Sequence, residues 1–230
     1  MTPATPSVAT GSPASVRAVG EPVEEPGTPS YPRDFEHDVV WSDGVTCRVR
    51  PIRPDDGHRL RDFHAHLSTR SAYLRFFTIH PELSAAEVER FTHVDYDDRL
   101  ALVAEREGLL IAVARYDRIP GSDEAEVAFV VTDDYQHHGI GTLLLDDLAE
   151  VALRRGITTF VASTLAENST MLGVFKHSGF QVTSSRDHET ISLRFSVVPD
   201  DRYRAALAAR QVAYRRTLPP QRADEGPSWR

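Results

Sequence analysis

The stretch DDYQHHGIGT, residues 133–142, lies between an apolar run that ends at Val131 and a run with helical spacing that begins near Gly139. Its two glycines let the backbone come close to a ligand, and a helix that starts on them directs its free N–H groups at that ligand. This arrangement suits an anion. The run before the turn, residues 124–131, carries two carboxylates, so a candidate base lies close in sequence to a candidate phosphate cradle.

Three kinds of phosphate site use a glycine-rich turn at the start of a helix, and each needs different residues around its glycines. A P-loop needs a lysine directly after its last glycine, and none stands there. A dinucleotide-binding fingerprint needs a third glycine where Leu144 stands and an acidic residue that the run 161–164 does not supply. The third kind is a pyrophosphate site in which the N–H groups of residues 138–142 and the Thr142 hydroxyl donate, with no metal.

The segments on either side of the turn alternate between strand and helix patterns. Strands are expected at 45–52, 100–105, 109–116, 124–131, 157–163, 180–182 and 190–197. Helices are expected at 55–67, 69–77, 84–94, 139–155 and 168–178. The expected N-caps are Asp55, then Ser68 or Thr69, then Ser84 in a capping box with Glu87. This order predicts an α/β fold with a mixed sheet.

The helix expected at 139–155 has an apolar stripe through Ile140, Leu144, Leu148 and Val151. Three polar side chains between these positions are therefore expected to face outward, namely Asp147, Glu150 and Arg154.

Length and composition favour one domain with tails, because the chain has 230 residues, of which 40% are hydrophobic and 26% charged. Residues 1–36 are rich in Pro, Ala and Ser without apolar periodicity, so we expect a disordered tail. Residues 37–199 are expected to form the domain, and 200–230 a docked C-terminal helix and tail. Its helical pattern combines Arg202, Arg204, Arg210, Arg215 and Arg216 with Tyr203, Leu207 and Tyr214.

Several classes of partner are not expected. The net charge is −8 without a basic run, which argues against nucleic acid. The first residues show no basic region followed by an apolar core, so we do not expect a secretory signal, and no apolar run is long enough to span a bilayer. We therefore expect a cytoplasmic protein without a membrane partner. Cys47, in an alternating strand, is interpreted as core. His64 and His66, like His137 and His138, lack spaced partner ligands, so no metal site is expected.

The run QHHGIG, residues 136–141, resembles the Q/R-x-x-G-x-G/A motif of the GCN5-related N-acetyltransferases (GNAT), which binds the pyrophosphate of coenzyme A. Downstream, ENSTM at 167–171, then Phe175-Lys176 and Gly179-Phe180, is similar to the asparagine loop, helix and Gly-Phe ending of that family.

Two further runs narrow the resemblance within the family. VRPIRPD at 49–55 and SAYLRFF at 71–77 resemble the acetyltransferase domain of bacterial protein-lysine acetyltransferases. The likeness extends from about Val45 to Val197. It implies the GNAT fold, an α/β architecture with a mixed and splayed central sheet flanked by helices, and acetyl-CoA as cosubstrate. The positions implied to bind that cosubstrate are Val130, Val131, Gln136, His137, His138, Gly139, Ile140, Gly141, Thr142, Asn168 and Phe175.

Acetylation of an amine needs a base, because a lysine ammonium has a reference pKa near 10.4. Glu124 and Glu126 share one strand face, and Glu126 lies nearer the turn. In the resembling lysine acetyltransferases the glutamate of an Ala-Glu-Val-Ala-Phe run is the base, which matches residues 125–129 here. Glu126 is therefore the predicted catalytic residue.

The remaining catalytic groups follow from the resemblance. It implies a strand N–H near Val130 or Val131 that stabilises the thioester oxyanion. It also implies a tyrosine seven residues after the loop asparagine that protonates the leaving thiolate, but Phe175 stands at that position. Water, Ser169 or departure of the unprotonated thiolate could replace it. Tyr135 lies too close to the pyrophosphate turn to be a confident substitute.

Together the residues and the resemblance predict direct transfer of an acetyl group to an amine, with a protein lysine as the expected acceptor. A small amine or an antibiotic amino group is the alternative within enzymes. A third hypothesis is a non-catalytic acyl-CoA sensor that signals through its basic C-terminal segment. Phe76 and Phe77 are interpreted as core or as a wall of the acceptor groove. An acidic surface around that groove would favour cationic acceptors of either kind.

Overall fold

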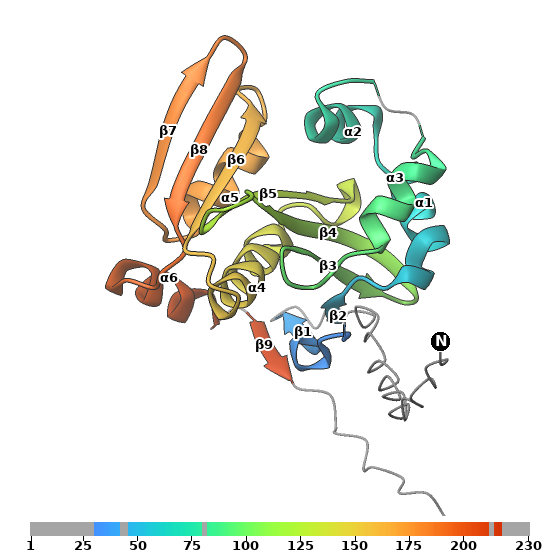
Figure 1. Ribbon diagram of the computed structural model, residues 1–230, viewed down its shortest axis with the longest axis horizontal. Helices are drawn as coiled ribbons and strands as arrows, with labels where there is room; N and C mark the ends of the chain where they lie inside the picture. The colour runs from blue at the N-terminus through green and yellow to red at the C-terminus, as the bar shows by residue number, and fades with distance from the viewer. Residues whose placement is uncertain (1–29, 42–45, 80–81, 212–213, 218–230) are drawn as a thin grey trace, which may run out of the picture.

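The computed structural model describes residues 30–41, 46–79, 82–211 and 214–217 (Figure 1). They form one mixed sheet with the strand order β7-β8-β6-β5-β4-β3-β2-β1-β9. The strands are β1 (His37–Trp41), β2 (Thr46–Pro51), β3 (Arg99–Arg106), β4 (Leu109–Arg118), β5 (Glu124–Val131), β6 (Thr159–Leu165), β7 (Val182–Asp187), β8 (Thr190–Ser196) and β9 (Tyr214–Thr217).

The helices that flank this sheet confirm the predicted α/β class. They are α1 (Gly57–Ala65), α2 (Thr69–Phe76), α3 (Ala85–Thr92), α4 (Ile140–Arg154), α5 (Ser169–His177) and α6 (Asp201–Gln211). Short 3₁₀ turns occur at η1 (Arg33–Phe35), η2 (Pro54–Asp56) and η3 (Asp133–Tyr135). None of the described helices is both long and apolar enough to cross a bilayer.

The sheet forks at Glu126. β5 and β6 pair in parallel over a short register, from Glu124 opposite Thr159 to Glu126 opposite Val161. Beyond this point β5 continues along β4 to Val131, while β6 continues along β8. Figure 1 shows the arm of β6, β8 and β7 swinging away from β5 and β4. Among the described strands, β5 therefore has no partner on its β6 side beyond Glu126.

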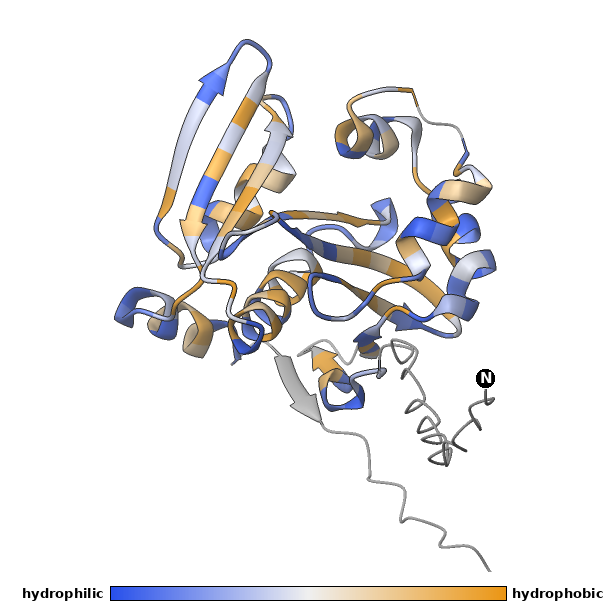
Figure 2. Ribbon diagram, viewed as in Figure 1, coloured by the Kyte–Doolittle hydropathy of each residue, from blue (hydrophilic) through white to orange (hydrophobic). Residues whose placement is uncertain are grey.

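Alternating residues of the central strands supply two apolar cores, one on each face of the sheet. On β3, Leu100 and Leu102 belong to the core that includes the apolar side of α4, whereas Ala101 and Val103 belong to the core formed with α1 and α3. Figure 2 shows the apolar residues gathered in β3, β4 and α4, while β7 is largely polar. The apolar interior therefore lies around β3, β4 and α4 and extends into the arm through Phe160 of β6 and Phe195 of β8, while β7 is mostly exposed.

The outer side of α4 is also covered, so the expectation that Asp147 faces outward is wrong. Asp146 and Asp147 are almost completely buried. Asp146 accepts hydrogen bonds from Arg210 of α6 at 2.8 and 3.2 Å, and Asp147 lies 3.3 Å from His37 of β1. Both covering elements are distant in sequence, so the helical pattern of α4 alone could not reveal them. Glu150 and Arg154 are exposed, as expected.

The expected N-terminal tail, residues 1–36, extends too far into the folded domain. Residues 30–36 are described, and η1 within them buries Phe35 in the core beside α4. β1 follows immediately and pairs with β2. Short segments that pack against distant elements have no periodic pattern of their own, which explains the misplaced boundary. The rest of the expected tail lies outside the described residues.

At the other end, α6 docks as expected through Tyr203, which is buried and stacks on Phe180 with ring centroids 4.3 Å apart. The helical pattern does not continue to Arg216, however. The helix ends at Gln211, and Tyr214–Thr217 forms β9, which pairs with β1 at the sheet edge. Backbone pairing with a strand near the other end of the chain decides this conformation. Residues 218–230 lie outside the described residues.

Local capping signals are mostly confirmed. The Ser68 hydroxyl accepts the N–H of Ser71 at the start of α2, and Ser84 and Glu87 form the predicted capping box of α3. Asp55 does not cap α1. That helix follows η2, and the neighbouring Asp56 is turned inward and buried. Cys47 is buried as expected, and burial raises the pKa of its thiol to about 12.

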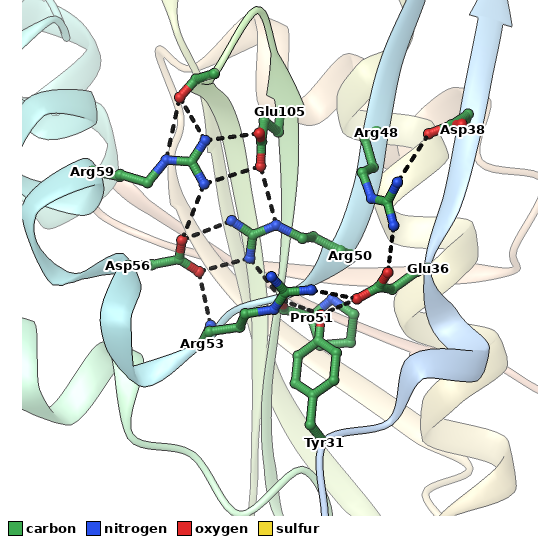
Figure 3. A network of polar contacts seen from close by, with 11 residues as sticks. Tyr31, Glu36, Asp38, Arg48, Arg50, Pro51, Arg53, Asp56, Arg59 and Glu105 are labelled. Carbon is green, nitrogen blue, oxygen red and sulfur yellow. Dashed lines mark hydrogen bonds and ion pairs between the residues drawn. The ribbon is translucent and has the colours of Figure 1, made fainter. Parts of the chain in front are cut away.

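A network of charged side chains fastens the N-terminal segment to the sheet (Figure 3). The Glu36 carboxylate accepts hydrogen bonds from Tyr31, Arg48 and Arg53 at 2.5–2.7 Å. Burial alone would raise the pKa of Glu36, but these donors outweigh it and lower that pKa to about 2. The ionised form of Glu36 is therefore strongly preferred in the folded chain.

The same network continues beneath α1 (Figure 3). Arg50 donates from both terminal nitrogens to Asp56 at 2.7 Å, and the two side chains are each 3% exposed. Arg50 also contacts Glu105 at 3.1 Å, and Arg59 contacts the same carboxylate at 2.8 Å. Burial alone would raise the pKa of Asp56, but the hydrogen bonds from Arg50 and the Arg53 N–H lower it.

Candidate functional site

A cavity of about 580 Å³ opens where β5 and β6 part. We call it the main cleft; it is lined by the two strands of the fork, α2, the start of α4, and α5 with the loop before it. The expected site residues that line it are Glu126, Val130, Val131, Gln136, His137, Gly139, Ile140, Gly141, Thr142, Asn168 and Phe175. His138 is exposed and does not line the main cleft, so its imidazole is not among the groups that the fold brings together.

The turn before α4 uses both glycines, for different reasons. Gly139 is the N-cap with a φ of 81°, in the left-handed region that favours glycine. A Cβ at Gly139 would meet nothing within 4 Å, whereas one at Gly141 would lie 3.3 Å from Cγ2 of Val174. Gly139 therefore shapes the turn, and Gly141 lets α4 pack closely on α5. The first N–H groups of α4 lack partners within the helix and border the cleft, an arrangement that suits an anion.

Four polar residues join this turn to α2, and we call them the α2 clasp: Ser68, Ser71, Asp133 and Gln136. Asp133 accepts hydrogen bonds from the Ser68 N–H at 3.0 Å and from both serine hydroxyls at 2.8 Å. Burial alone would raise the pKa of Asp133, but these donors lower it. The Gln136 amide donates to the Ser71 hydroxyl and to the Val131 carbonyl, each at 3.2 Å. Gln136 thus holds the turn in place.

The asparagine loop and α5 close the side of the cleft opposite α2. The Asn168 carboxamide oxygen accepts the Met171 N–H at 3.0 Å and so caps α5. Phe175 is 3% exposed and packs between Phe129 and Phe195, with ring centroids 5.5 Å away on each side. Phe175 therefore acts mainly as core, although it also borders the cleft.

The two carboxylates of β5 have different surroundings. The Glu124 carboxylate accepts hydrogen bonds from both terminal nitrogens of Arg194, and this pairing lowers the pKa of Glu124. Glu126 is exposed at the fork and lines the main cleft. No hydrogen bond or ion pair joins Glu126 to another described residue. Of the two, only Glu126 is free to accept a proton from a bound substrate.

The free edge of β5 presents backbone groups to the cleft. In the antiparallel pairing with β4, Ile119 donates to the Glu124 carbonyl and Thr132 donates to the Ile111 carbonyl. Since hydrogen-bonded positions recur every second residue, the even-numbered residues of β5 face β4. The N–H groups of Phe129 and Val131 therefore face the open side, whereas that of Val130 faces β4. Of the two N–H groups that the resemblance implies as oxyanion donors, that of Val131 is therefore open to the cleft and that of Val130 is not. The N–H of Phe129 is a further open group.

The cleft residues of α2 were not predicted from the sequence. α2 contributes Arg70, Leu74 and Arg75 to the main cleft, together with Phe77, which follows it with a left-handed φ of 61° and is 42% exposed. Of the aromatic pair, Phe77 is thus the cleft wall, while Phe76 packs against the core beside α1 and α3. The run 71–77 supported the resemblance, but no local pattern shows which side of this short helix faces the fork.

A hydroxyl-rich groove lies on the other side of Glu126. It has a volume of about 570 Å³ and shares Glu126 with the main cleft. The β6, β7 and β8 strands line it, with the hydroxyl groups of Ser163, Thr183, Ser184, Ser185 and Ser192. Glu126 therefore stands where the two spaces meet.

A forked sheet with an anion-binding helix start on one side and an unpaired carboxylate at the branch point defines a group-transfer enzyme with a phosphate-bearing donor. The sequence model described as the Acetyltransferase (GNAT) family matches residues 66–180. The chain belongs to this family. It is accordingly an acetyltransferase, within the acyltransferases, and its acyl donor is acetyl-CoA.

Individual relatives agree with this assignment. An acetyltransferase of Pseudomonas aeruginosa is 30% identical over 152 residues, which cover 64% of this chain and 82% of that protein. Acetyltransferase Pat of Mycolicibacterium smegmatis is 34% identical over 134 residues, but the match spans 57% of this chain and only 40% of that longer protein. The crystal structure of the GNAT domain of S. lividans PAT is 44% identical with a TM-score of 0.69, covering 73% of this chain and 99% of that domain.

Proposed function

We propose that this acetyltransferase transfers the acetyl group directly from acetyl-CoA to a lysine side chain of a protein, with Glu126 as the general base. The observation that carries the proposal is the placement of Glu126, an unpaired carboxylate at the branch point of the sheet that lines both the main cleft and the hydroxyl-rich groove. The resemblance of residues 49–55 and 71–77 to bacterial protein-lysine acetyltransferases supports lysine as the acceptor.

The donor side of the proposal rests on the start of α4. Its first N–H groups and the Thr142 hydroxyl border the cleft and suit a pyrophosphate. The bound donor supplies a thioester carbonyl that an amine can attack. Open N–H groups on the free edge of β5 can donate to the oxygen of that carbonyl as negative charge develops on it.

Spacing along the strand favours one of these N–H groups. A strand rises by about 3.3 Å per residue, which puts Phe129 about 10 Å and Val131 about 16 Å from Glu126. A lysine amine must be within reach of both the base and the thioester, directly or through one water. Phe129 is therefore the better oxyanion donor, and Val131 is better placed to hold the donor farther from the branch point.

Departure of the thiolate needs no dedicated side chain in this proposal. Phe175 occupies the position of the family's tyrosine and has no proton to give. A thiol with a reference pKa near 8.5 leaves adequately as the thiolate, and water or the Ser169 hydroxyl at the cleft can supply a proton afterwards.

Incubation of the purified protein with acetyl-CoA and a lysine-bearing protein mixture tests this function. We expect release of free CoA together with acetyl-lysine detected by mass spectrometry, and neither product with the Glu126→Gln variant. Release of CoA with small amines alone would replace the protein acceptor by a small molecule. Tight acetyl-CoA binding without CoA release from any amine would contradict the enzyme proposal and favour an acyl-CoA sensor.

A further inference from the structure

Arg75 occupies an unusual position on the acceptor side of the site. It projects from α2 and lines the main cleft together with Glu126. It also lines a small apolar cavity of about 50 Å³ under α1 and α3, and Ala128 and Val130 border both spaces. Arg75 therefore stands at the boundary between the cleft and an apolar interior. The two residues of β5 that border both spaces lie two and four positions after the predicted base.

Among the described residues, no carboxylate forms an ion pair with Arg75. Its guanidinium makes no hydrogen bond or ion pair there, and its one aromatic contact is with the Phe76 ring, whose centroid is 5.1 Å away. Burial, followed by the charge of Arg115, lowers the pKa of Arg75 to about 10, although the charges of Glu126 and Asp117 act in the opposite direction, so the side chain is still a cation at neutral pH. An unpaired cation in such surroundings has a cost in stability, and such costs concentrate at functional sites.

The nearest carboxylates cannot serve as its permanent partner. Asp117 stands opposite Glu126 in the β4–β5 register, and Arg99 and Arg115 contact it at 3.1 and 3.6 Å, with Arg90 at 4.0 Å. Four arginines, counting Arg75, thus share two carboxylates on this face. The chain as a whole carries −8, but the wall beside Glu126 has a surplus of positive charge.

Arg115 is the second arginine of this positively charged surface beside Glu126, after Arg75. It lies two residues from Asp117 on the same face of β4, and its side chain is 25% exposed. Its buried Nε makes no hydrogen bond, although the Asp117 carboxylate is 3.6 Å away. The planar guanidinium of arginine suits a carboxylate, because two parallel N–H groups can donate to its two oxygens.

Resting on the proposed function, we propose that Arg75, with Arg115 behind it, forms a carboxylate-binding subsite beside Glu126, so that the enzyme prefers a reaction partner with a carboxylate near the reacting atoms. The carboxylate can come from either of two sources. It can belong to the acceptor, as an acidic residue next to the target lysine, or to the acyl donor, as the far end of a dicarboxylic acyl group. A purely cationic acceptor is disfavoured at this wall.

Matched substrate pairs distinguish the two sources. With acetyl-CoA, a lysine peptide with flanking aspartates is compared with the same peptide carrying asparagines. With the asparagine peptide, succinyl-CoA is compared with butyryl-CoA. We expect the carboxylate-bearing member of one pair to have the higher kcat/KM by about 10- to 100-fold, the range of a charge-assisted hydrogen bond. Calorimetric affinities for the same pairs provide the comparison independently of turnover.

Three variants test the assignment to Arg75. In Arg75→Met the preference should fall to near one, and in Arg75→Lys it should survive in part. Arg90→Met removes a nearby exposed cation outside both cavities and should keep the preference. Thermal unfolding adds a second measurement, because loss of an unpaired cation should leave Arg75→Met at least as stable as the wild type. If Arg75 were needed only for structure, the Arg75→Met variant would instead unfold at a lower temperature than the wild type.

Equal rates and equal affinities within both pairs would overturn the subsite, as would an Arg75→Met variant that weakens both members of each pair equally or unfolds at lower temperature. Failure of the proposed function has a different signature. In that case no peptide is acylated by any donor, while the calorimetric comparison still reports whether Arg75 recognises a carboxylate.

Discussion

At the scale of single residues, the two glutamates of β5 show how surroundings separate chemically identical groups. Glu124 and Glu126 share a strand face, yet Arg194 engages only Glu124 and lowers its pKa. Glu126 is at the branch point of the sheet, without an internal partner among the described residues. Sequence spacing favoured Glu126 by its nearness to the turn, and the structure adds a second reason, namely that no ion pair with a described residue occupies its carboxylate, although Arg75 lines the same cleft.

A substitution that keeps the shape of Glu126 tests its role. We expect Glu126→Gln to lower kcat by roughly 100- to 10,000-fold, because the amide cannot accept the proton of the ammonium. Acetyl-CoA affinity should stay unchanged. Glu124→Gln is the matched control and should retain turnover within a few-fold, since it loses only an exposed pair with Arg194. Near-normal turnover in Glu126→Gln would remove the assignment of Glu126 as base.

Gly139 offers a second test at this scale, against Gly121 as its control. Both have a positive φ, 81° and 73°, and a Cβ at either would meet nothing within 4 Å. Alanine should therefore cost each about 1–2 kcal/mol of unfolding free energy through the left-handed backbone alone. Only Gly139→Ala should also weaken acetyl-CoA binding, by about tenfold, as measured by calorimetry. Equal affinities in the two variants would mean that the turn before α4 does not hold the donor.

Residues of the site differed in how well the sequence predicted them. The glycines and Glu126 belong to one short segment whose spacing carries the chemistry, so they could be identified without tertiary structure. Arg75 could not, because its importance depends on which side of α2 faces the fork and on the absence of a carboxylate partner. His138 was included among the donor-binding positions with a side chain that reaches either solvent or a phosphate, and in the structure that side chain is exposed and lies outside the cleft. Spacing identifies the turn but not the direction of each side chain on it.

At the scale of elements, the α2 clasp connects the two halves of the reaction. Asp133 and Gln136 belong to the turn that precedes α4, while Ser68 and Ser71 belong to α2, which carries Arg75 and Leu74 into the cleft. Hydrogen bonds among these four residues therefore hold the turn before α4 against α2.

Removal of the central carboxylate of the clasp should weaken both substrates together. We expect Asp133→Ala to lower the free energy of unfolding by about 1–3 kcal/mol, because the Ser71 hydroxyl and the Ser68 N–H lose their acceptor. KM should rise for acetyl-CoA and for the acceptor alike. Asp134→Ala is the matched control, since Asp134 is exposed in the same turn without a described hydrogen bond. An unchanged acceptor KM in Asp133→Ala would show that the clasp does not couple the two sides.

Elements with local signals were predicted well, and those that depend on distant partners were not. The bounds of β5 and the capping box of α3 agree with expectation because both are encoded within a few neighbouring residues. β1 and β9 were missed because each is stabilised by pairing with a strand far along the chain. The burial of Asp147 depends in the same way on His37, more than a hundred residues earlier.

At the scale of the whole molecule, the Arg50–Asp56 pair ties β2 to α1, and the face it supports carries the acceptor wall. Replacement of one partner leaves the other charge buried and unpaired, so Asp56→Asn should cost about 3–5 kcal/mol of unfolding free energy. The double variant Arg50→Met with Asp56→Leu should cost less than that single change. Urea unfolding measures all three proteins. A double variant less stable than Asp56→Asn would show that the pair contributes net stability rather than specificity of packing.

Glu36 makes the free energy of unfolding depend on pH in the acidic range. Its folded pKa of about 2 lies below the ordinary value of 4.5, so the unfolded chain binds the proton first as pH falls. Its contribution is therefore complete above about pH 4.5 and is lost as pH falls toward 2, with a slope of up to about 1.4 kcal/mol per pH unit. Glu36→Gln should be less stable than the wild type at pH 7 and should lose less stability on acidification. Urea unfolding at pH 7, 5, 4 and 3 measures this, with Glu82→Gln as the exposed control. Parallel pH profiles for Glu36→Gln and the wild type would show that the anchored N-terminal segment does not set the acid limit of the fold.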